Sequence, residues 1–342
     1  ILGEGAWGFH IVNLVLHSVN AMLVFFCAGK FFERSVAGIC AFIFLCHPLQ
    51  TEAVNSVVGR AELLAAFWML VAWFVFLHDV GWRRWVLVSG AILLGCLCKE
   101  HAVTMVGIVA VASFAGLPNV TWGREGVRVS FMTRWARFCK EDLLGMLLCV
   151  GAVGLFLVAR YAVVGGVLLP SQPTFVDNPL AHVESWERRL TALHVIWHYA
   201  KLMVWAGDLS ADYSYQAIPI VSSFWTGTVL GGVGVFYLLG LFIVSTVRGN
   251  SPPIWGLIAS WMLLPFLPVS NLWFPIGTIM AERLMYVPMV GYAILGGFGF
   301  WGMKTKWPRY AWVIAVILFA LWSKKTVQRN ADWYSDYTLF AS

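Results

Sequence analysis

The chain has 342 residues, of which 60% are hydrophobic and only 12% are charged, and its mean hydropathy is +0.77. This balance excludes a soluble globular protein, because soluble domains carry about 25% charged residues. The net charge of +6 does not indicate a nucleic-acid partner, because basic residues beside membrane spans account for it. We therefore predict a polytopic membrane protein whose partner is the lipid bilayer, with no nucleic acid bound.

Apolar runs follow one another along the chain and lack the alternation of polar and apolar residues that a transmembrane barrel needs. The sequence therefore predicts an all-α, polytopic transmembrane helical bundle. Two runs, 35–47 and 85–98, are too short for a full crossing, so we expect them to abut polar helical ends or water-filled clefts. The ten predicted spans cover residues 9–28, 35–47, 62–78, 85–98, 102–117, 142–164, 226–247, 253–269, 284–303 and 309–323.

Lysine and arginine are concentrated in three connections between these runs, at 79–84, 121–140 and 303–309. Because cytosolic loops carry an excess of these residues, we place these three connections on the cytosolic side. The segment around 47–53, the loops 165–188 and 270–283, and the C-terminal end then face the lumen. The glycosylation sequon at 119–121 falls in a predicted cytosolic loop, so its glycosylation would overturn this orientation.

Residues 190–207 are apolar enough to cross the membrane. One more crossing there would, however, move the later basic loops to the lumenal side. We therefore predict a re-entrant or interfacial helix inside a lumenal loop that spans 165–225. The aromatic residues Trp197, Tyr199 and Trp205 are typical of a membrane interface. On this division, residues 1–323 form the transmembrane domain, and 324–342 form a polar lumenal segment leading into a further region.

Three charged residues, Glu52, Arg60 and Glu62, stand in a short stretch between two apolar runs. We expect residues 51–63 to form one helix with Thr51 as its N-cap and Glu52 in its first turn. Glu52 is then either a cap at the membrane surface or part of a binding site. Arg60 and Glu62 either form a mutual pair that orders the helix end or contact a ligand directly.

A polar stripe marks one face of the first predicted span, where His10, Asn13, His17 and Asn20 share an arc of roughly 80°. We favour a hydrogen-bonded contact between helices over direct ligand binding. The stripe contains no carboxylate, and the seven cysteines lie in or beside apolar runs without metal-site spacing. We therefore predict no bound metal and no disulfide framework.

Two further groups of cations lie near the predicted lumenal surface. Lys99 and His101 flank Glu100, and Lys99 either reaches toward the lipid headgroups or holds an anionic lipid head. Arg283 follows Glu282, which can steady the guanidinium and leave its remaining donors for a phosphate. We therefore predict Arg283 as a phosphate-binding residue.

Six segments, in order along nearly the whole chain, resemble the TMTC family of transmembrane O-mannosyltransferases that target cadherins. The resemblance implies a multispanning core of the GT-C glycosyltransferase fold, followed by tetratricopeptide repeats into which RNADWYSDYTLF leads. The six segments are FHIVNLVLHSVN, HPLQTEAVNSVVGRAELLA, CKEHAVT, FVDNPLAH followed by LTAL, LSADYS followed by AIP, and NLWFPIGTIMAERLMYVPMVGY.

This resemblance implies transfer of mannose from dolichyl phosphate mannose to Ser or Thr hydroxyls of secretory or cell-surface protein domains in the endoplasmic reticulum lumen. The lipid-linked donor is a substrate, and no cofactor is expected. A carboxylate has to take the acceptor's proton as general base, and cationic side chains can stabilise the departing phosphate. The family's acidic pair lies in the first lumenal loop, so the general base is expected upstream of this chain.

The resemblance also assigns roles to residues of this chain. Glu52 and Glu62 are second-rank candidates for the base. The donor phosphate is expected to contact Arg283, Lys99, His101 and Arg60. The turns at Asp177, Asn178, Asp212 and Tyr213 are expected to contact the acceptor or the donor.

Two other functions remain open at this point. A catalytically silent scaffold subunit of the same fold would lack the acidic pair in its parent protein. A membrane transporter would show internal repeats and broken helices in matching positions of two halves, and we see no such symmetry in the sequence.

Overall fold

A computed structural model of the chain describes residues 6–117, 130–166, 173–214, 217–335 and 338–339. Within these ranges all regular structure is helical, which confirms the predicted all-α fold. The sequon at 119–121 lies outside the described residues. The helices are α1 (Ala6–Ala28), α2 (Arg34–Cys46), η1 (Pro48–Gln50), α3 (Thr51–Asn55), α4 (Arg60–His78), α5 (Gly81–Cys98), η2 (Glu100–Thr104), α6 (Met105–Ala115), α7 (Phe131–Glu141), α8 (Leu143–Val164), η4 (Pro179–Ala181), α9 (Ser185–Val204), α10 (Gly227–Arg248), α11 (Pro253–Leu263), η5 (Leu267–Val269), η6 (Glu282–Met285), α12 (Pro288–Lys306) and α13 (Pro308–Asp332).

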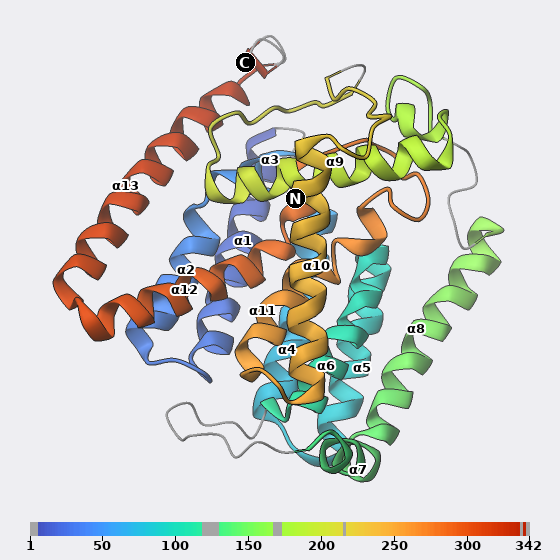
Figure 1. Cartoon of the computed structure of the whole chain (residues 1–342), viewed down its shortest axis with the longest axis vertical. Helices are drawn as coiled ribbons and strands as arrows, with labels where there is room; N and C mark the ends of the chain where they lie inside the picture. The colour runs from blue at the N-terminus through green and yellow to red at the C-terminus, as the bar shows by residue number, and fades with distance from the viewer. Residues whose placement is uncertain (1–5, 118–129, 167–172, 215–216, 336–337, 340–342) are drawn as a thin grey trace.

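Most of the long helices run roughly along the long axis of the molecule, and α9 lies across one end of them (Figure 1). This end, which we call the α9 end, also carries α3 and the C-terminus. Helix α7 lies at the opposite end, which we call the α7 end, beside the turn between α4 and α5 (Figure 1). Because the chain passes repeatedly between the two ends, connections that are distant in sequence meet at each of them.

Each of the ten predicted spans is largely helical, but the helices differ in length. Six of them, α1, α4, α5, α8, α10 and α13, are long and apolar enough to cross a membrane. A seventh is reached if α2 is counted with η1 and α3, to which it is joined at a bend of 51°. Helices α6 and α11 are shorter, and α12 is rich in glycine and ends on two lysines. The expectation that 85–98 is too short was wrong, because α5 begins at Gly81 and has 18 residues.

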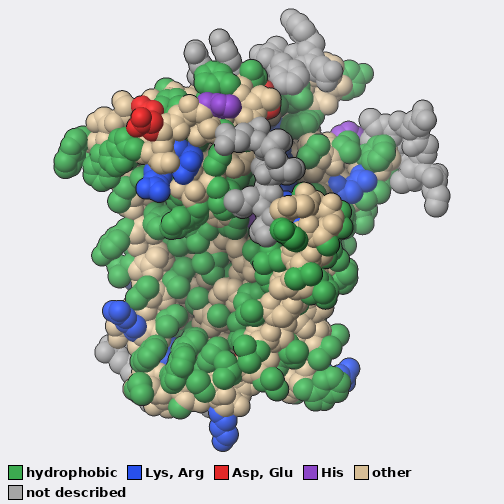
Figure 2. Space-filling model, turned by 90° about the vertical axis from the view of Figure 1, so that its right-hand side faces the viewer, with side chains coloured by type: hydrophobic (Ala, Val, Ile, Leu, Met, Phe, Trp, Pro, Cys, Tyr) green, Lys and Arg blue, Asp and Glu red, His purple; other side chains and the backbone are tan. Residues whose placement is uncertain are grey.

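The outer surface of the bundle suits a lipid environment. Only 11% of the residues in the apolar stretches of α10 and α13 are buried, so these helices turn apolar side chains outward. On the face shown in Figure 2, hydrophobic side chains cover the middle of the molecule, and Lys and Arg side chains stand toward its two ends. The chain is therefore a multi-pass membrane protein.

Helix α9 corresponds to the segment 190–207 for which we predicted a re-entrant or interfacial placement, and it lies crosswise over α10 (Figure 1). Its backbone comes very close to α10, because a Cβ atom at Gly232 would lie 1.9 Å from the carbonyl oxygen of Leu193. Only glycine permits this approach. A glycine in α10 thus lets α9 lie flat across the end of the bundle.

The predicted single helix over 51–63 is interrupted, and that expectation was wrong. Helix α3 ends at Asn55 and α4 begins at Arg60. The turn between them is tight, because a Cβ atom at Gly59 would lie 2.1 Å from the carbonyl oxygen of Ala53. Thr51 is not the N-cap either, since its hydroxyl donates to the carbonyl of Pro48 at 2.7 Å. The interruption separates Glu52 from Glu62.

Candidate functional site

The candidate site lies at the α9 end, where η6 meets α3. The buried carboxylate of Glu52 accepts a hydrogen bond from the backbone N–H of Arg283 at 2.8 Å. Its other oxygen forms an ion pair with the Arg283 guanidinium. Burial raises the pKa of Glu52, and the charge of Arg283 acts in the opposite direction. One carboxylate therefore fixes both the backbone and the side chain of Arg283.

Arg283 keeps an open side. Its side chain is 28% exposed, and only its Nη1 nitrogen contacts Glu52. Among the described residues, none accepts a hydrogen bond from its Nε or Nη2 nitrogens. A guanidinium fixed on one side and open on the other can bind an oxyanion such as phosphate through two donors.

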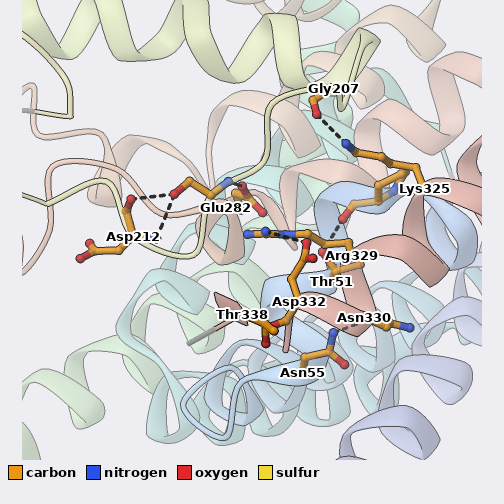
Figure 3. A network of polar contacts seen from close by, with 12 residues as sticks. Thr51, Asn55, Gly207, Asp212, Glu282, Lys325, Arg329, Asn330, Asp332 and Thr338 are labelled. Atoms are coloured by element: carbon orange, nitrogen blue, oxygen red, sulfur yellow. Dashed lines mark hydrogen bonds and ion pairs between the residues drawn. The ribbon is translucent and has the colours of Figure 1, made fainter. Parts of the chain in front are cut away.

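Glu282 does not steady that guanidinium, so this expectation was wrong. Its side chain is fully buried, and its Oε1 accepts bonds from the backbone N–H of Ser210 at 2.7 Å and the hydroxyl of Tyr213 at 2.9 Å. Burial raises the pKa of Glu282 to about 8, and the nearby charge of Glu52 adds to this effect while Arg329 opposes it. Figure 3 shows Glu282 and Arg329 side by side. Glu282 therefore fastens the loop around Tyr213 to η6.

Tyr199 is a site residue that the sequence did not reveal. We expected it at a membrane interface, but it is only 4% exposed and points from α9 toward η6. Its hydroxyl donates to the carbonyl of Ala281 at 2.9 Å and accepts from the N–H of the same residue at 2.9 Å. The sequence of this apolar, aromatic helix is equally compatible with a buried, hydrogen-bonded tyrosine and with a tyrosine at the membrane interface. Both polar backbone groups of Ala281 are thus satisfied by one side chain.

A second pair of a cation with a buried carboxylate lies at the α9 end. Lys99, at the end of α5, contacts Glu62 at 2.7 Å, and His101 contacts the same carboxylate at 3.5 Å. Glu62 is 1% exposed, whereas the Lys99 side chain is 25% exposed. Glu62 therefore holds Lys99 at the surface in much the same way that Glu52 holds Arg283.

Arg60 does not pair with Glu62, which excludes the mutual pair, one of the two alternatives left open for these residues. It donates instead to the side chain of Asn13 at 3.0 Å and to the carbonyl of Phe9 at 3.1 Å. Residues two apart on a helix point in different directions, which explains why Arg60 reaches α1 while Glu62 reaches α5. Arg60 thus fastens two helices together.

The polar stripe of α1 makes the helix contacts that its spacing favoured. Asn13 donates to the carbonyls of Val54 and Ser56, each at 3.0 Å. His17 bonds to the hydroxyl of Tyr286 at 2.8 Å, and Asn20 donates to the same hydroxyl at 3.1 Å. His10, the remaining member of the stripe, is half-buried. These side chains connect α1 with α3 and with the loop that carries Arg283.

The predicted turn residues have different roles. Asn178 is fully buried and donates to the side chain of Asn271 at 3.0 Å and to the carbonyl of Ile276 at 2.7 Å, so it joins two loops. Asp177 accepts from the hydroxyl of Thr174 at 2.6 Å, and Asp212 accepts from the N–H of Ser214 at 2.8 Å. Both carboxylates therefore stabilise local turns.

The polar end of α13 lies beside Glu282, as Figure 3 shows. Lys325 donates to the carbonyl of Gly207 at 2.7 Å, and Asn330 accepts a bond from Asn55 at 2.8 Å. The buried Arg329 contacts Asp332 at 3.1 Å. The helix runs without interruption from Pro308 to Asp332, so the segment that we assigned from 324 onward begins inside α13.

Known proteins are similar in sequence to nearly the whole of this chain. Residues 170–240 match the family described as protein O-mannosyl-transferase TMTC, DUF1736. Protein O-mannosyl-transferase TMTC3 of Mus musculus is 31% identical over 98% of this chain and 38% of its own length. TMTC3 of Homo sapiens is 30% identical with the same coverage, and TMTC4 of Homo sapiens is 29% identical over 98% of this chain and 50% of its own length. The chain thus spans half or less of these relatives, and no solved structure matches it.

Proposed function

Because the chain belongs to the TMTC family, we propose that it forms the membrane core of a protein O-mannosyl-transferase. The donor is dolichyl phosphate mannose, and the acceptor is a Ser or Thr hydroxyl of a secretory or cell-surface protein domain. The α9 end faces the lumen of the endoplasmic reticulum. The relatives are named for this transferase activity, and the resemblance supplies the donor and the compartment.

The single observation that carries this proposal is the open side of Arg283. When the sugar leaves the lipid phosphate, negative charge grows on the phosphate oxygens and has to be stabilised by donors already in place. Glu52 holds the Arg283 guanidinium in one position, with further N–H donors directed away from the ion pair. Because the arginine is already in position, no free energy is needed to order a flexible side chain during the reaction.

Lys99 is a second cation at the same end of the bundle. Its ammonium carries three donors, and the contact with Glu62 at 2.7 Å uses one side of it. The buried carboxylate limits how far the long lysine side chain can move. Lys99 is therefore suited to help bind the charged end of the donor. His101, which we expected to contact the phosphate as well, is instead buried against Glu62.

An apolar groove on the outward face of α10 has room for part of a lipid chain. It has a volume of about 470 Å³ and runs along the helix from Val233 to Val244, a distance of roughly 17 Å for a helical segment. One wall begins with Leu193 of α9, the helix that also carries Tyr199. We assign this groove to part of the isoprenoid chain of the donor. It is lined by Leu193, Val233, Phe236, Tyr237, Gly240, Leu241 and Val244.

The general base remains assigned upstream of this chain. Both oxygens of Glu52 contact Arg283, and the Oε1 of Glu62 contacts the ammonium of Lys99 at 2.7 Å. As placed, the two carboxylates position cations. A transporter is not favoured, because Asn13, His17 and Asn20 bond to neighbouring helices and the hydroxyl of Tyr286. These bonds use the three side chains as contacts between helices.

The test uses the full-length parent protein in membranes, supplied with dolichyl phosphate mannose and an extracellular β-domain as acceptor. Wild-type protein is expected to transfer mannose, and Arg283→Ala is expected to lose most of this activity. Arg84→Ala is the matched control, because Arg84 pairs with Asp142 at 2.7 Å at the α7 end. No transfer by the wild type would overturn the transferase and favour a silent scaffold. Full activity in Arg283→Ala would remove the phosphate-binding role.

A further inference from the structure

The loop that presents Arg283 is held at three successive residues by three different parts of the fold. Ala281 is bound through both its backbone groups by Tyr199 of α9. Glu282 is bound by Ser210 and Tyr213 of the segment that follows α9. Arg283 is bound by Glu52 of α3. We call the first two of these connections the 281–282 tether.

The tether matters because η6 is a short helix inside a loop that runs from α11 to α12. Such a segment has little regular structure of its own to fix the position of a side chain. Glu52 sets the distance between Arg283 and α3, and the Tyr286 hydroxyl joins the far end of η6 to α1, but neither contact holds residues 281 and 282. Two further attachments, from α9 and from the segment after it, hold these two residues.

The tether consists of buried hydrogen bonds that are costly to break. Buried backbone N–H and C=O groups need partners, and the Tyr199 hydroxyl serves both groups of Ala281 at 2.9 Å each. The Glu282 carboxyl group is fully buried, and Ser210 and Tyr213 donate to its Oε1, so losing them would leave a buried acceptor without these donors. Each attachment would be costly to open, and each ends next to Arg283.

We propose that Tyr199 and Glu282 are positioning residues that set the place of Arg283 against the phosphate of the lipid-linked donor. The inference rests on the proposed function, because it takes Arg283 as the residue that contacts this phosphate. Through the tether, the affinity for the donor depends on α9 and on the segment 205–214. Neither Tyr199 nor Glu282 contacts the substrate itself.

The first experiment compares Tyr199→Phe with Tyr286→Phe in the full-length parent protein. Both substitutions remove one buried hydroxyl that makes two hydrogen bonds, but the Tyr286 hydroxyl bonds to His17 and Asn20 of α1. Tyr199→Phe is expected to raise the KM for dolichyl phosphate mannose about tenfold, because small displacements of binding groups cost up to about 100-fold. The KM for the acceptor should stay unchanged. Tyr286→Phe should lower stability without a comparable rise in the donor KM.

The second experiment uses conservative and non-conservative changes at Glu282. Glu282→Gln keeps an oxygen that accepts from both Ser210 and Tyr213, so the donor KM should stay within about twofold of the wild type at neutral pH. Glu282→Ala removes that acceptor and should raise the donor KM about tenfold, as Tyr199→Phe does. Equal donor KM values for Glu282→Gln and Glu282→Ala would count against a positioning role.

A third measurement separates failure of this inference from failure of the proposed function. Amide hydrogen exchange of residues 281–285 should be at least about tenfold faster in Tyr199→Phe than in Tyr286→Phe, whether or not the protein transfers mannose. An active wild type with the same donor KM in both tyrosine variants would overturn the inference. Unchanged exchange would overturn the tether even if the wild type proved inactive.

Discussion

The two ends of the bundle each contain an arginine paired with a carboxylate, and the surroundings of the two arginines differ. At the α7 end, Arg84 pairs with Asp142 at 2.7 Å, and its guanidinium lies 5.3 Å from the ring centre of Phe76 and 4.7 Å from that of Trp85. Its side chain is 13% exposed. At the α9 end, Arg283 pairs with Glu52, and its side chain is 28% exposed.

Other arginines at the α7 end also have structural roles. Arg137 donates to the carbonyls of Ser113 and Phe114 at 3.1 and 3.2 Å, where α6 ends. Arg134 donates to the carbonyl of Thr246 near the end of α10 at 3.3 Å. These bonds go to carbonyls in the last turns of α6 and α10, two of which also accept from the N–H of the capping glycines Gly116 and Gly249. An ion pair alone therefore does not mark a site; an ion pair whose remaining donors are exposed to a ligand does.

The largest effect on activity is expected for replacement of Arg283, compared with replacement of Arg84. Arg283→Ala should lower kcat/KM for mannose transfer by about 100-fold or more, since loss of one preorganised donor to a developing anion typically costs 10² to 10³. Arg84→Ala should lower the melting temperature in detergent while each folded molecule keeps its activity. Equal losses of activity in the two variants would show that the ends do not differ.

A smaller effect is expected at Lys99. Lys99→Ala leaves the buried Glu62 without its closest cation, so the free energy of unfolding should fall by about 1–3 kcal/mol. Transfer activity should fall about tenfold, because a second cation near the phosphate is lost. Thermal unfolding and initial-rate assays measure the two changes. A loss of stability with unchanged activity would place Lys99 with Arg84 among the structural cations.

The pH dependence of stability tests the environment of Glu282. Its pKa is raised from 4.5 to about 8 in the folded protein, chiefly by burial. Between these values the folded chain keeps a proton that the unfolded chain has released, so stability should fall as pH rises through this window and level off above it. The melting temperature of the wild type minus that of Glu282→Gln should follow this trend. A difference that is constant from pH 5 to 9 would contradict it.

The smallest effect is expected at the turn residues of the α9 end. Asp177→Ala should change the free energy of unfolding by about 0.5 kcal/mol or less and activity by less than about twofold, since the carboxylate serves an exposed turn. Asn178→Ala should cost about 1–3 kcal/mol, because it removes a fully buried side chain that donates to Asn271 and to the carbonyl of Ile276. A large loss of activity in a stable Asp177→Ala protein would instead indicate contact with substrate.

The helices and the polar stripe could be predicted because they depend on local spacing. The apolar runs predict the helices, and the spacing of Asn13, His17 and Asn20 places these residues on one helix face. The failed pair of Arg60 and Glu62 could also have been avoided, since residues two apart do not face each other on a helix. Each of these features depends only on residues that are close together in the sequence.

The partners within the site could not be predicted in this way. Glu52 and Arg283 are 231 residues apart in sequence, and only the packing of η6 on α3 brings them together. Glu282 lies next to Arg283 in sequence but points to the opposite side, toward Tyr213. Tyr199 carries no local signal, because its role depends on α9 lying across the bundle end (Figure 1).

The central claim is that Arg283, fixed by Glu52, binds the phosphate of the lipid-linked donor. Equilibrium binding of dolichyl phosphate to the purified parent protein tests it without requiring transfer of the sugar. The account predicts that Arg283→Ala raises the Kd at least about tenfold, a change of about 1.4 kcal/mol, while Arg84→Ala leaves the Kd as in the wild type. The same Kd in all three proteins would contradict the account.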